Sequence, residues 1–188
     1  MNLLKLISEK KPRTIGIDGN SGAGKTNLAK ELASKIDGFV IPVDLFHKQE
    51  RKHWSLKTDI NDFEDFEKLN KVIKRLLKGE SFTLDKLYNH VDGTYTRSFH
   101  FEPKKFLIIE GLCVMRLDLD FKIFLHVDPK MALVRGKDRD IRERNLTEEQ
   151  WAIKKYLFHD EYSKIIPELK KKADLVIDTT DKFPKLDS

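Results

Sequence analysis

A glycine-rich stretch at residues 19–26 constrains the fold of this chain more than any other feature. It reads Gly-Asn-Ser-Gly-Ala-Gly-Lys-Thr and matches the pattern G-x-x-x-x-G-K-[ST] in full. An apolar-rich run at 14–18 precedes it and a helical apolar pattern follows it, so the required strand–loop–helix context is present. Glycines let successive backbone N–H groups turn inward around an anion, and the helix N-terminus adds partial positive charge. The stretch therefore predicts a loop that binds the phosphates of a nucleoside triphosphate.

Eight consecutive residues make up this predicted nucleotide-binding loop: Gly19, Asn20, Ser21, Gly22, Ala23, Gly24, Lys25 and Thr26. The ammonium group of Lys25 can reach the β- and γ-phosphates of a bound nucleotide. The hydroxyl of Thr26 can ligate Mg²⁺. We therefore expect Lys25 to act on the phosphates and Thr26 on the metal.

The length and composition describe a folded chain. Its 188 residues fit one domain, or one domain with a small insert, around a substantial core. Hydrophobic residues make up 39% and charged residues 36%, which is typical of a soluble chain with a charged surface and excludes a disordered one. No apolar run approaches the roughly 20 residues that span a bilayer, so we expect no membrane association.

The N-terminal residues 1–11 and the single cysteine bear on the compartment. The N-terminal segment lacks a long apolar core and a small-residue cleavage site, so it predicts a short amphipathic element and not a signal peptide. Cys113 cannot form an internal disulfide, which indicates a reducing compartment. We expect a cytoplasmic protein in which Cys113 is a small buried hydrophobe.

The formal net charge of +5 raises nucleic-acid binding as a function. Lysines cluster at 154–155 and 170–172, within segments that predict helices, and such clusters are typical of solvated helix faces. No recognisable nucleic-acid module accompanies them. We expect no nucleic-acid partner, and the sequence leaves open whether the chain forms a homo-oligomer.

Five apolar, strand-like runs alternate with helical patterns along the chain. The runs cover 14–18, 39–43, 105–110, 122–127 and 174–178; the helical patterns cover 24–36, 63–78, 129–143 and a segment that starts at the Thr147–Gln150 capping box and that Pro167 ends or kinks. Residues 80–104 are predicted to be irregular, with Asp92-Gly93 marking a hairpin turn. The alternation predicts an α/β fold with a parallel, doubly wound sheet that helices cover on both faces.

Acidic residues close the predicted strands, at the sheet edge where doubly wound folds bind ligands. They are Asp18, Asp44, Glu110, Asp128 and Asp178. Asp44 suits a general base that deprotonates or orients an acceptor hydroxyl, or else a cap of the following turn. Glu110 suits an acid that holds Mg²⁺ or its waters, with a structural ion pair as the alternative. We expect Asp18 to support the loop backbone and Asp128 to cap a helix, and Asp178 has no assigned role.

Residues 135–144 are too charged to form a core helix, and they carry several arginines. Guanidinium groups stabilise the charge on the equatorial oxygens of a phosphoryl group in transfer. A mobile lid bearing these groups would also exclude water that hydrolyses the nucleotide. The alternative is a surface helix in which Asp138, Asp140 and Glu143 neutralise the arginines.

These motifs fall in the order seen in uridine kinases, which the chain resembles over roughly residues 13–178. The resemblance rests on the glycine-rich loop, Asp44 with Phe46 and His47 nearby, Tyr88, Ile109-Glu110-Gly111, Arg139-Asp140-Ile141-Arg142-Glu143-Arg144 and Lys172-Ala173-Asp174-Leu175-Val176-Ile177. The arginine segment is similar to the lid sequence of that family, Arg-Asp-Ile-x-Glu-Arg. Phosphoribulokinases, pantothenate kinases and nicotinamide riboside kinases share this plan.

The resemblance implies a P-loop NTPase fold with five parallel strands in the order 2-3-1-4-5, and ATP and Mg²⁺ as co-substrates. It implies a single kinase domain over 1–188, with an acceptor-binding insert region at 46–104 and a lid at 130–146. By position, Asp44 matches the general base of the family and Lys25 its loop lysine. Arg135, Arg139 and Arg144 match lid arginines near the triphosphate, so we expect Asp44, Lys25 and Arg139 to be catalytic and Arg135 and Arg144 to bind nucleotide.

The sequence departs from uridine kinases where the acceptor would bind. That family carries Tyr-Asp-Phe followed by His-Ser-Arg, whereas here Tyr88-Asn89-His90 leads to Gly93 at the place of the family histidine. The stretch from Asp59 lies where the family places a ribose-binding Asp but lacks Phe-Asp-His-Pro, and Trp54 has no assigned role. The expected acceptor-binding residues are Asp44, His47, Asp59, Tyr88 and His90.

The sequence therefore predicts a kinase that moves the γ-phosphate of ATP to a hydroxyl of a small molecule, such as a nucleoside or another ribose-like compound. A nucleoside monophosphate kinase is an alternative, with Arg51, Arg97 and Arg116 as the additional arginines that a phosphorylated acceptor requires. A nucleotide-binding homologue without activity is another alternative. A regulatory GTPase is disfavoured because the chain has no Asn-Lys-x-Asp motif to read guanine.

Overall fold

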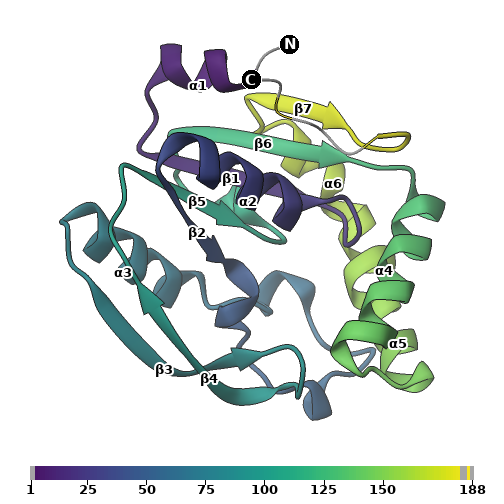
Figure 1. Cartoon of the computed structure of the whole chain (residues 1–188). Helices are drawn as coiled ribbons and strands as arrows, with labels where there is room; N and C mark the ends of the chain where they lie inside the picture. The colour runs from purple at the N-terminus through teal and green to yellow at the C-terminus, as the bar shows by residue number, and fades with distance from the viewer. Residues whose placement is uncertain (1–2, 183–185, 187–188) are drawn as a thin grey trace.

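A five-stranded parallel sheet forms the centre of the computed structural model, which describes residues 3–182 and residue 186 (Figure 1). Its strands are β1 (Thr14–Gly19), β2 (Gly38–Pro42), β5 (Phe106–Glu110), β6 (Phe121–His126) and β7 (Leu175–Asp178). They lie in the order β2-β5-β1-β6-β7, and every neighbouring pair is parallel. Counted along the chain among these five strands, this is the expected order 2-3-1-4-5, and the α/β prediction is confirmed.

Helices cover both faces of the sheet, because β1, β5 and β6 are apolar on both sides. The core on one face joins the sheet to α1 (Leu3–Lys10) and α2 (Lys25–Ile36). The core on the other face joins it to α3 (Phe66–Leu77) and α6 (Tyr162–Lys170). The short amphipathic element expected near the N-terminus is therefore α1, which buries Leu3 and Ile7.

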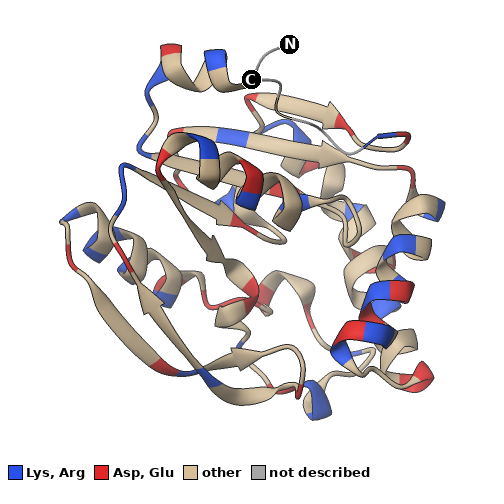
Figure 2. Cartoon of the chain, viewed as in Figure 1, with Lys and Arg blue, Asp and Glu red and all other residues tan. Residues whose placement is uncertain are grey.

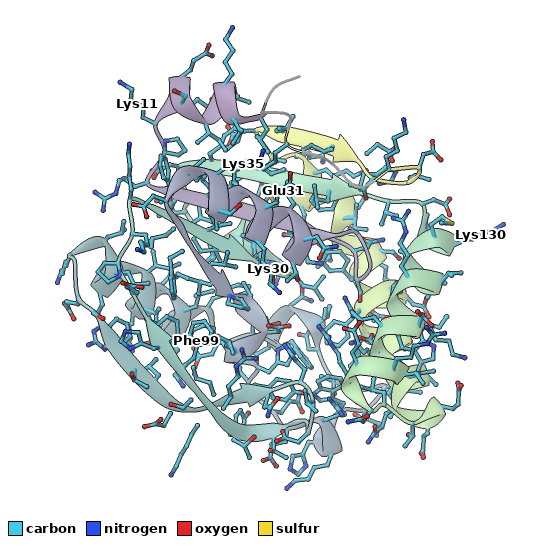
Figure 3. All side chains as sticks on the ribbon, in the orientation of Figure 1. Lys11, Lys30, Glu31, Lys35, Phe99 and Lys130 are labelled. Carbon is cyan, nitrogen blue, oxygen red and sulfur yellow. The ribbon has the colours of Figure 1, made fainter. Side chains whose placement is uncertain are left out.

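The described part of the C-terminal segment packs on α2. The backbone N–H of Leu186 donates to Glu31 Oε1 at 3.0 Å, and Lys35 Nζ donates to the Leu186 carbonyl at 2.9 Å. Figure 3 labels Glu31 and Lys35 on this helix. The contact adds the buried Leu186 side chain to the α1–α2 core.

Residues 80–104 form an antiparallel hairpin, which corrects the prediction of an irregular segment. Its strands are β3 (Phe82–Asn89) and β4 (Thr94–Phe101), and the expected turn at Asp92-Gly93 joins them. The register shifts between Leu84 and Asn89 interrupt the alternation of apolar and polar residues, which hides the strands from a periodicity reading. Figure 1 shows the hairpin below the carboxyl ends of the sheet strands.

Short 3₁₀ turns connect β2 to α3 and place several side chains below the sheet edge. They cover Val43–Phe46, Arg51–His53 and Ile60–Asp62, and a further one, Val114–Arg116, follows β5. The helix α3 begins at Phe66 and not at residue 63, because the Asp65 carboxylate caps it by accepting from the Lys68 N–H at 2.8 Å.

The charged segment forms α4 (Pro129–Arg144), which stands with α5 (Glu148–Lys155) beside the carboxyl ends of the strands (Figure 1). Asp128 caps α4 as expected, because its Oδ1 accepts from the N–H groups of Lys130 and Met131. Thr147 and Gln150 form the expected capping box at the start of α5. Both signs of charge run along α4 and α5 (Figure 2).

The chain continues from α5 through a π-helical segment, Tyr156–Glu161, into α6. Pro167 lies inside α6, which continues to Lys170. The prediction that the helix ends at this proline is therefore wrong. Leu169, beyond the proline, is buried in the core on that face. No helix among the described residues is long and apolar enough to cross a membrane.

Candidate active site

A cavity of about 360 Å³ lies where the phosphate loop, the turn after β2, the end of β5, and helices α4 and α5 meet. Many of the predicted site residues line it: Ser21, Gly22, Gly24, Lys25, Thr26, Asp44, His47, Tyr88, His90, Glu110, Arg135, Arg139 and Arg144. The structure thus brings together, at one edge of the sheet, residues separated by up to 123 positions in the chain. Gly19, Asn20 and Ala23 belong to the same loop but do not line the cavity.

The loop has the geometry of an anion-binding turn. Gly22 and Gly24 have φ values of +89° and +91°, which are open to glycine, and a Cβ on Gly22 would lie 2.6 Å from the Ala132 carbonyl oxygen. Helix α2 starts directly after Gly24 without a side-chain cap, so its first N–H groups are left for a ligand. Lys25 Nζ donates to the carbonyls of Gly19 at 2.7 Å and Asn20 at 3.0 Å, which holds the ammonium over the loop.

Asp18 supports the loop from below, as predicted. Its carboxylate accepts from the N–H of Gly19 at 2.8 Å, from the N–H of Met115 at 2.9 Å and from the Tyr162 hydroxyl at 2.6 Å. Burial raises the pKa of Asp18, and the three donors oppose that rise. The carboxylate therefore ties the loop to the turn after β5 and to α6.

Thr26 and Glu110 form a pair of oxygen ligands beside the loop. The Thr26 hydroxyl donates to Glu110 Oε1 at 3.0 Å, which joins the first turn of α2 to the end of β5. Glu110 is 6% exposed, and burial, with the nearby charge of Asp44, raises its pKa to about 7. A nearby cation would stabilise the ionised form of this buried carboxylate. Oxygen atoms such as those of hydroxyl and carboxylate groups are the ligands that Mg²⁺ prefers.

Asp44 lines the same cavity as Lys25, with His90 and Arg144 as its neighbours. Its Oδ2 lies 3.2 Å from His90 Nδ1 and 3.9 Å from Arg144 Nη2. Burial raises the pKa of the Asp44 carboxyl, but its neighbours, His90 and Arg144 foremost, together lower it by a larger amount. The pKa of Asp44 therefore lies below its ordinary value. Burial lowers the pKa of His90 to about 4, so its ring is neutral at pH 7 and Arg144 supplies the lasting positive charge.

The other carboxylate oxygen of Asp44, Oδ1, is buried and accepts no hydrogen bond from any residue that the structure describes. A buried carboxylate oxygen without a donor is unfavourable unless a ligand supplies one. Asp44 is the second residue of the 3₁₀ turn Val43–Phe46, which has no side-chain cap, so the alternative of a turn cap is not supported.

Three cations of the lid segment and α5 converge on one buried acid, Asp140. Its carboxylate lies 2.9 Å from Arg139 Nη2, 3.4 Å from Arg144 Nε and 2.6 Å from Lys154 Nζ. Lys154 is 5% exposed and lines the cavity, so its prediction as part of a solvated helix face is wrong. The periodic position of Lys154 on a short polar helix gave no sign that α5 would pack against α4.

Arg135 takes a different position from the other lid arginines. Its guanidinium donates to the carbonyls of Thr179 at 2.9 Å and Thr180 at 2.8 Å, which fastens α4 to the segment after β7. It also lines the cavity, on the side of the loop. The alternative prediction for this segment is a surface helix whose acids neutralise its arginines. Arg142 fits that alternative, because its Nε lies 2.8 Å from the exposed Asp138.

An aromatic chamber, formed by the rings of His47, Trp54, Phe63 and Tyr88, surrounds a buried hydrogen bond between His47 and Glu64. His47 Nδ1 lies 2.8 Å from Glu64 Oε2, and both side chains are nearly inaccessible to solvent. The rings of Tyr88 and Phe63 pack on His47, with centroids 4.4 Å and 4.6 Å away. Burial raises the pKa of Tyr88 to about 12, so its hydroxyl is protonated at neutral pH.

Asp59 does not belong to this site, which corrects its prediction as an acceptor-binding residue. It is exposed, caps the turn Ile60–Asp62 by accepting from the Asn61 N–H at 2.8 Å, and does not line the cavity. The acid that does line it is Glu64, five residues later. The sequence contains one indication of this, because Phe63 directly precedes Glu64. An acid next to an aromatic residue is a better candidate for a buried pocket than Asp59, which lies in a polar turn.

Two further residues line the cavity, Trp54 and Arg51. The prediction of a kinase that phosphorylates a hydroxyl gave neither of them a role in the site. Trp54 packs on Phe63 and Tyr88, and its indole N–H is buried without an acceptor among the described residues. The guanidinium of Arg51 reaches the cavity from the same stretch of chain. Of the arginines weighed for a phosphorylated acceptor, Arg97 and Arg116 do not line the cavity.

Known proteins with similar sequences are kinases. A uridine kinase from Geobacillus kaustophilus (strain HTA426) is 29% identical over 187 residues, covering 89% of this chain and 86% of that protein. A uridine kinase from Lactobacillus helveticus (strain DPC 4571) is 27% identical over 185 residues, covering 89% of this chain and 87% of that protein.

Solved structures show the same fold. A candidate fructose transport system kinase from Silicibacter sp. TM1040 superimposes with a TM-score of 0.67 at 19% identity, covering 94% of this chain and 99% of that one. A possible uridine kinase from Bacillus stearothermophilus superimposes with a TM-score of 0.53 at 23% identity, covering 88% of both chains. The arrangement of the sheet, the loop and the flanking helices is thus shared with these structures.

The model of one protein family matches residues 37–183, which run from β2 to beyond β7 and include Asp44, Glu110 and the arginines of α4. This match covers most of the chain, and the relatives above extend the similarity to the phosphate loop. The chain belongs to the phosphoribulokinase / uridine kinase family.

Proposed function

We propose that this protein uses ATP and Mg²⁺ to phosphorylate a hydroxyl group of a small molecule. The observation that carries the proposal is that Asp44, an ionised carboxylate with an unpartnered Oδ1, shares one cavity with Lys25 and Thr26. A base at one end of a phosphate-binding cavity is the arrangement that in-line transfer to a hydroxyl requires.

The loop would bind the triphosphate. The uncapped start of α2 offers N–H groups, and Lys25 would move from the carbonyls of Gly19 and Asn20 to the β- and γ-phosphates. Ser21 and Gly22 would bring the backbone close to the phosphates. The half-buried position of Lys25 raises the strength of these contacts, because water competes less for the ammonium.

Thr26 and Glu110 would hold Mg²⁺, since their oxygens lie 3.0 Å apart and the buried Glu110 lacks a full countercharge. No group of three or more His, Cys, Asp or Glu side chains suited to a metal occurs in the described part of the chain. This fits an ion that takes one or two protein ligands and shares the rest with phosphate oxygens and water. The chemistry that Mg²⁺ supplies when bound is neutralisation of phosphate charge.

Asp44 would accept the proton of the acceptor hydroxyl, or orient that hydroxyl for attack on the γ-phosphorus. Arg139 and Arg144 would stabilise the charge on the transferred group, and Asp140, itself bound by Lys154, would hold these guanidinium groups in place. In this proposal residues 130–146 act as the lid of a single domain, and Arg135 anchors its base while contributing positive charge near the triphosphate.

The acceptor would bind in the aromatic chamber within the 46–104 insert region. The His47–Glu64 pair can exchange hydrogen bonds with sugar hydroxyls, and Tyr88 and Trp54 offer aromatic surface with polar tips. His90 would touch the acceptor beside Asp44. These features suit a nucleoside or another compound with several hydroxyl groups.

A nucleoside monophosphate acceptor is less well supported, because only Arg51 among its three candidate arginines lines the cavity. A non-catalytic homologue has no observation in its favour, since the base, the loop lysine and the lid arginines share one cavity.

The test is ATP consumption with Mg²⁺ and single acceptors: uridine, cytidine, adenosine, ribose, fructose, pantothenate and uridine monophosphate. We expect turnover with at least one hydroxyl compound and a phosphorylated product by mass spectrometry. Turnover of uridine monophosphate alone would overturn the proposed acceptor class. ATP binding without turnover on any member would favour the non-catalytic homologue.

A further inference from the structure

We infer that Arg51 is a positioning residue that aligns the acceptor hairpin and the lid helix on Asp44; this rests on the function proposed above. Arg51 starts a 3₁₀ turn between β2 and α3, and it is 8% exposed. Its guanidinium donates to backbone carbonyls and not to the phosphate loop, Thr26 or Glu110.

The Arg51 guanidinium joins two separate parts of the chain. Its Nη1 donates to the carbonyl of Arg144, the last residue of α4, at 3.2 Å, and its Nη2 donates to the carbonyl of His90 in the hairpin turn. The backbone N–H of Arg51 donates to the carbonyl of Gly93, at the other end of that turn, at 2.8 Å. One residue thus fixes both ends of the hairpin turn and the end of the lid helix.

The two residues whose carbonyls the Arg51 guanidinium holds both bring a side chain within 4.0 Å of the Asp44 carboxylate. His90 Nδ1 lies 3.2 Å from Asp44 Oδ2, and Arg144 Nη2 lies 3.9 Å from the same atom. A shift of either backbone would therefore change the surroundings of the base directly. Arg51 thus acts on this geometry through the backbone of His90 and Arg144, without an ion pair to the Asp44 carboxylate.

The chemistry of this contact requires an arginine. No Asp or Glu among the described residues lies within 4.0 Å of the Arg51 guanidinium, so carbonyl oxygens take the place of the usual carboxylate partner. The carbonyl of Arg144 lies at the negative end of α4, which favours a cation. The planar guanidinium fork can reach two carbonyls at once, whereas the single ammonium of lysine cannot hold both in the same geometry.

The hairpin turn is fitted closely around Arg51. Gly93 has a φ of +75°, and a Cβ there would lie 2.6 Å from Arg51 Cβ and 2.9 Å from Arg51 Nε. Any other residue at 93 would thus push against the Arg51 side chain. This gives a second way to disturb the contact while Arg51 itself stays in the chain.

The test compares Arg51→Lys and Arg51→Met with Gly93→Ala. Matched controls are Arg97→Lys and Arg97→Met on β4, because the Arg97 guanidinium packs 5.5 Å from the Phe99 ring and does not line the cavity. For each variant, kcat and KM are measured for ATP and for the panel acceptor that the unmodified protein uses best. Hydrogen exchange of residues 88–95 and of the end of α4 gives a readout that needs no activity, and a thermal melt checks folding.

We expect both Arg51 variants to lose about 10- to 100-fold in kcat, with the KM for ATP within threefold of the unmodified protein. Exchange should rise in the hairpin turn and at the end of α4 but not in α2. Gly93→Ala should change both readouts in the same direction, and the Arg97 pair should change neither.

Full activity in Arg51→Lys would overturn the inference, because charge alone would then suffice. Unchanged exchange at both segments would also overturn it, whatever the activity. A protein that turns over no acceptor but shows the expected exchange pattern would contradict the proposed function and leave the positioning role supported.

Discussion

Arg139 Nη2 donates a hydrogen bond to Ser21 Oγ at 3.0 Å, so the lid helix contacts the phosphate loop directly. The same guanidinium is held by Asp140 Oδ1, at 3.0 Å from Nε and 2.9 Å from Nη2. Asp140 therefore holds Arg139 beside the loop. In the proposed function, the phosphates of a bound nucleotide would compete with Ser21 for this guanidinium.

Replacing Arg139 with Ala should lower kcat by about 100-fold or more, because a guanidinium at the transferred phosphate acts mainly in the transition state. The KM for the acceptor should change much less. Steady-state kinetics with the best panel acceptor measure both. Arg142→Ala is the control, since Arg142 is exposed and pairs with Asp138 on the same helix. Equal losses in kcat and in acceptor affinity would count against a transition-state role.

Replacing Lys25 with Met should reduce turnover by orders of magnitude while the fold remains, because the loop would lose its only ammonium over the phosphates. Circular dichroism and a thermal melt check the fold, and ATP consumption checks the turnover. Lys30→Met is the comparison, as Lys30 also lines the cavity but lies one and a half turns further along α2. Near-normal turnover in Lys25→Met would rule out the assigned role of the loop lysine.

Replacing Asp44 with Asn should abolish phosphoryl transfer and spare ATP binding, because the amide keeps the shape of the side chain but cannot take a proton. Isothermal titration with ATP and Mg²⁺ separates the two effects. If ATP affinity collapsed along with transfer, Asp44 would be a nucleotide or metal residue instead of the base.

The stability of the protein should fall between pH 6.5 and pH 4, in part through His159. Burial lowers the pKa of His159 from 6.5 to about 4, so below pH 6.5 the unfolded chain binds a proton that the folded chain excludes. For this residue the loss between pH 7 and pH 5 is about 2 kcal/mol. Urea unfolding of His159→Gln should show a correspondingly weaker pH dependence, whereas the exposed control His53→Gln should follow the unmodified protein. Parallel curves for His159→Gln and the unmodified protein would contradict this.

Replacing Gly136 with Ala should stabilise α4 by about 0.4–1 kcal/mol, because alanine restricts the unfolded chain and favours the helix. The added Cβ would lie 3.5 Å from His159 Nε2 and 3.6 Å from Ser21 Oγ and Trp151, which are ordinary contact distances. A thermal melt measures the gain. A lower melting temperature would show that α4, α5 and the loop leave no room for a methyl group.

Local chemistry made much of the fold predictable. The phosphate loop, the cap at Asp128 and the capping box at Thr147 depend on neighbours within a few residues, and the structure contains all three features. The five apolar runs identified the sheet, most clearly at β1, β5 and β6, which are buried on both faces. The hairpin strands were missed because β-bulges break their alternation.

The acceptor half of the site depends on contacts that the sequence does not display. Asp59 and Glu64 lie five positions apart in an acidic stretch, and only the packing of His47 selects Glu64. Lys154 follows a pattern of solvated lysines until Asp140, on another helix, pairs with it. The part played by Arg51 depends on two carbonyls that lie 39 and 93 residues away in the chain.

The π-helical segment Tyr156–Glu161 joins α5 and α6 into one continuous helix, which contacts both the lid helix and the strand below the phosphate loop. Each residue turns an α-helix by about 100°, so the extra residue of a wide turn rotates everything beyond it by that angle. Before this turn Lys154 faces Asp140 of the lid helix, and after it Tyr162 faces Asp18 beneath the phosphate loop. Removing one residue from the segment would rotate α6 relative to α5 by about 100°. The helix could then no longer make the Lys154–Asp140 and Tyr162–Asp18 contacts at the same time.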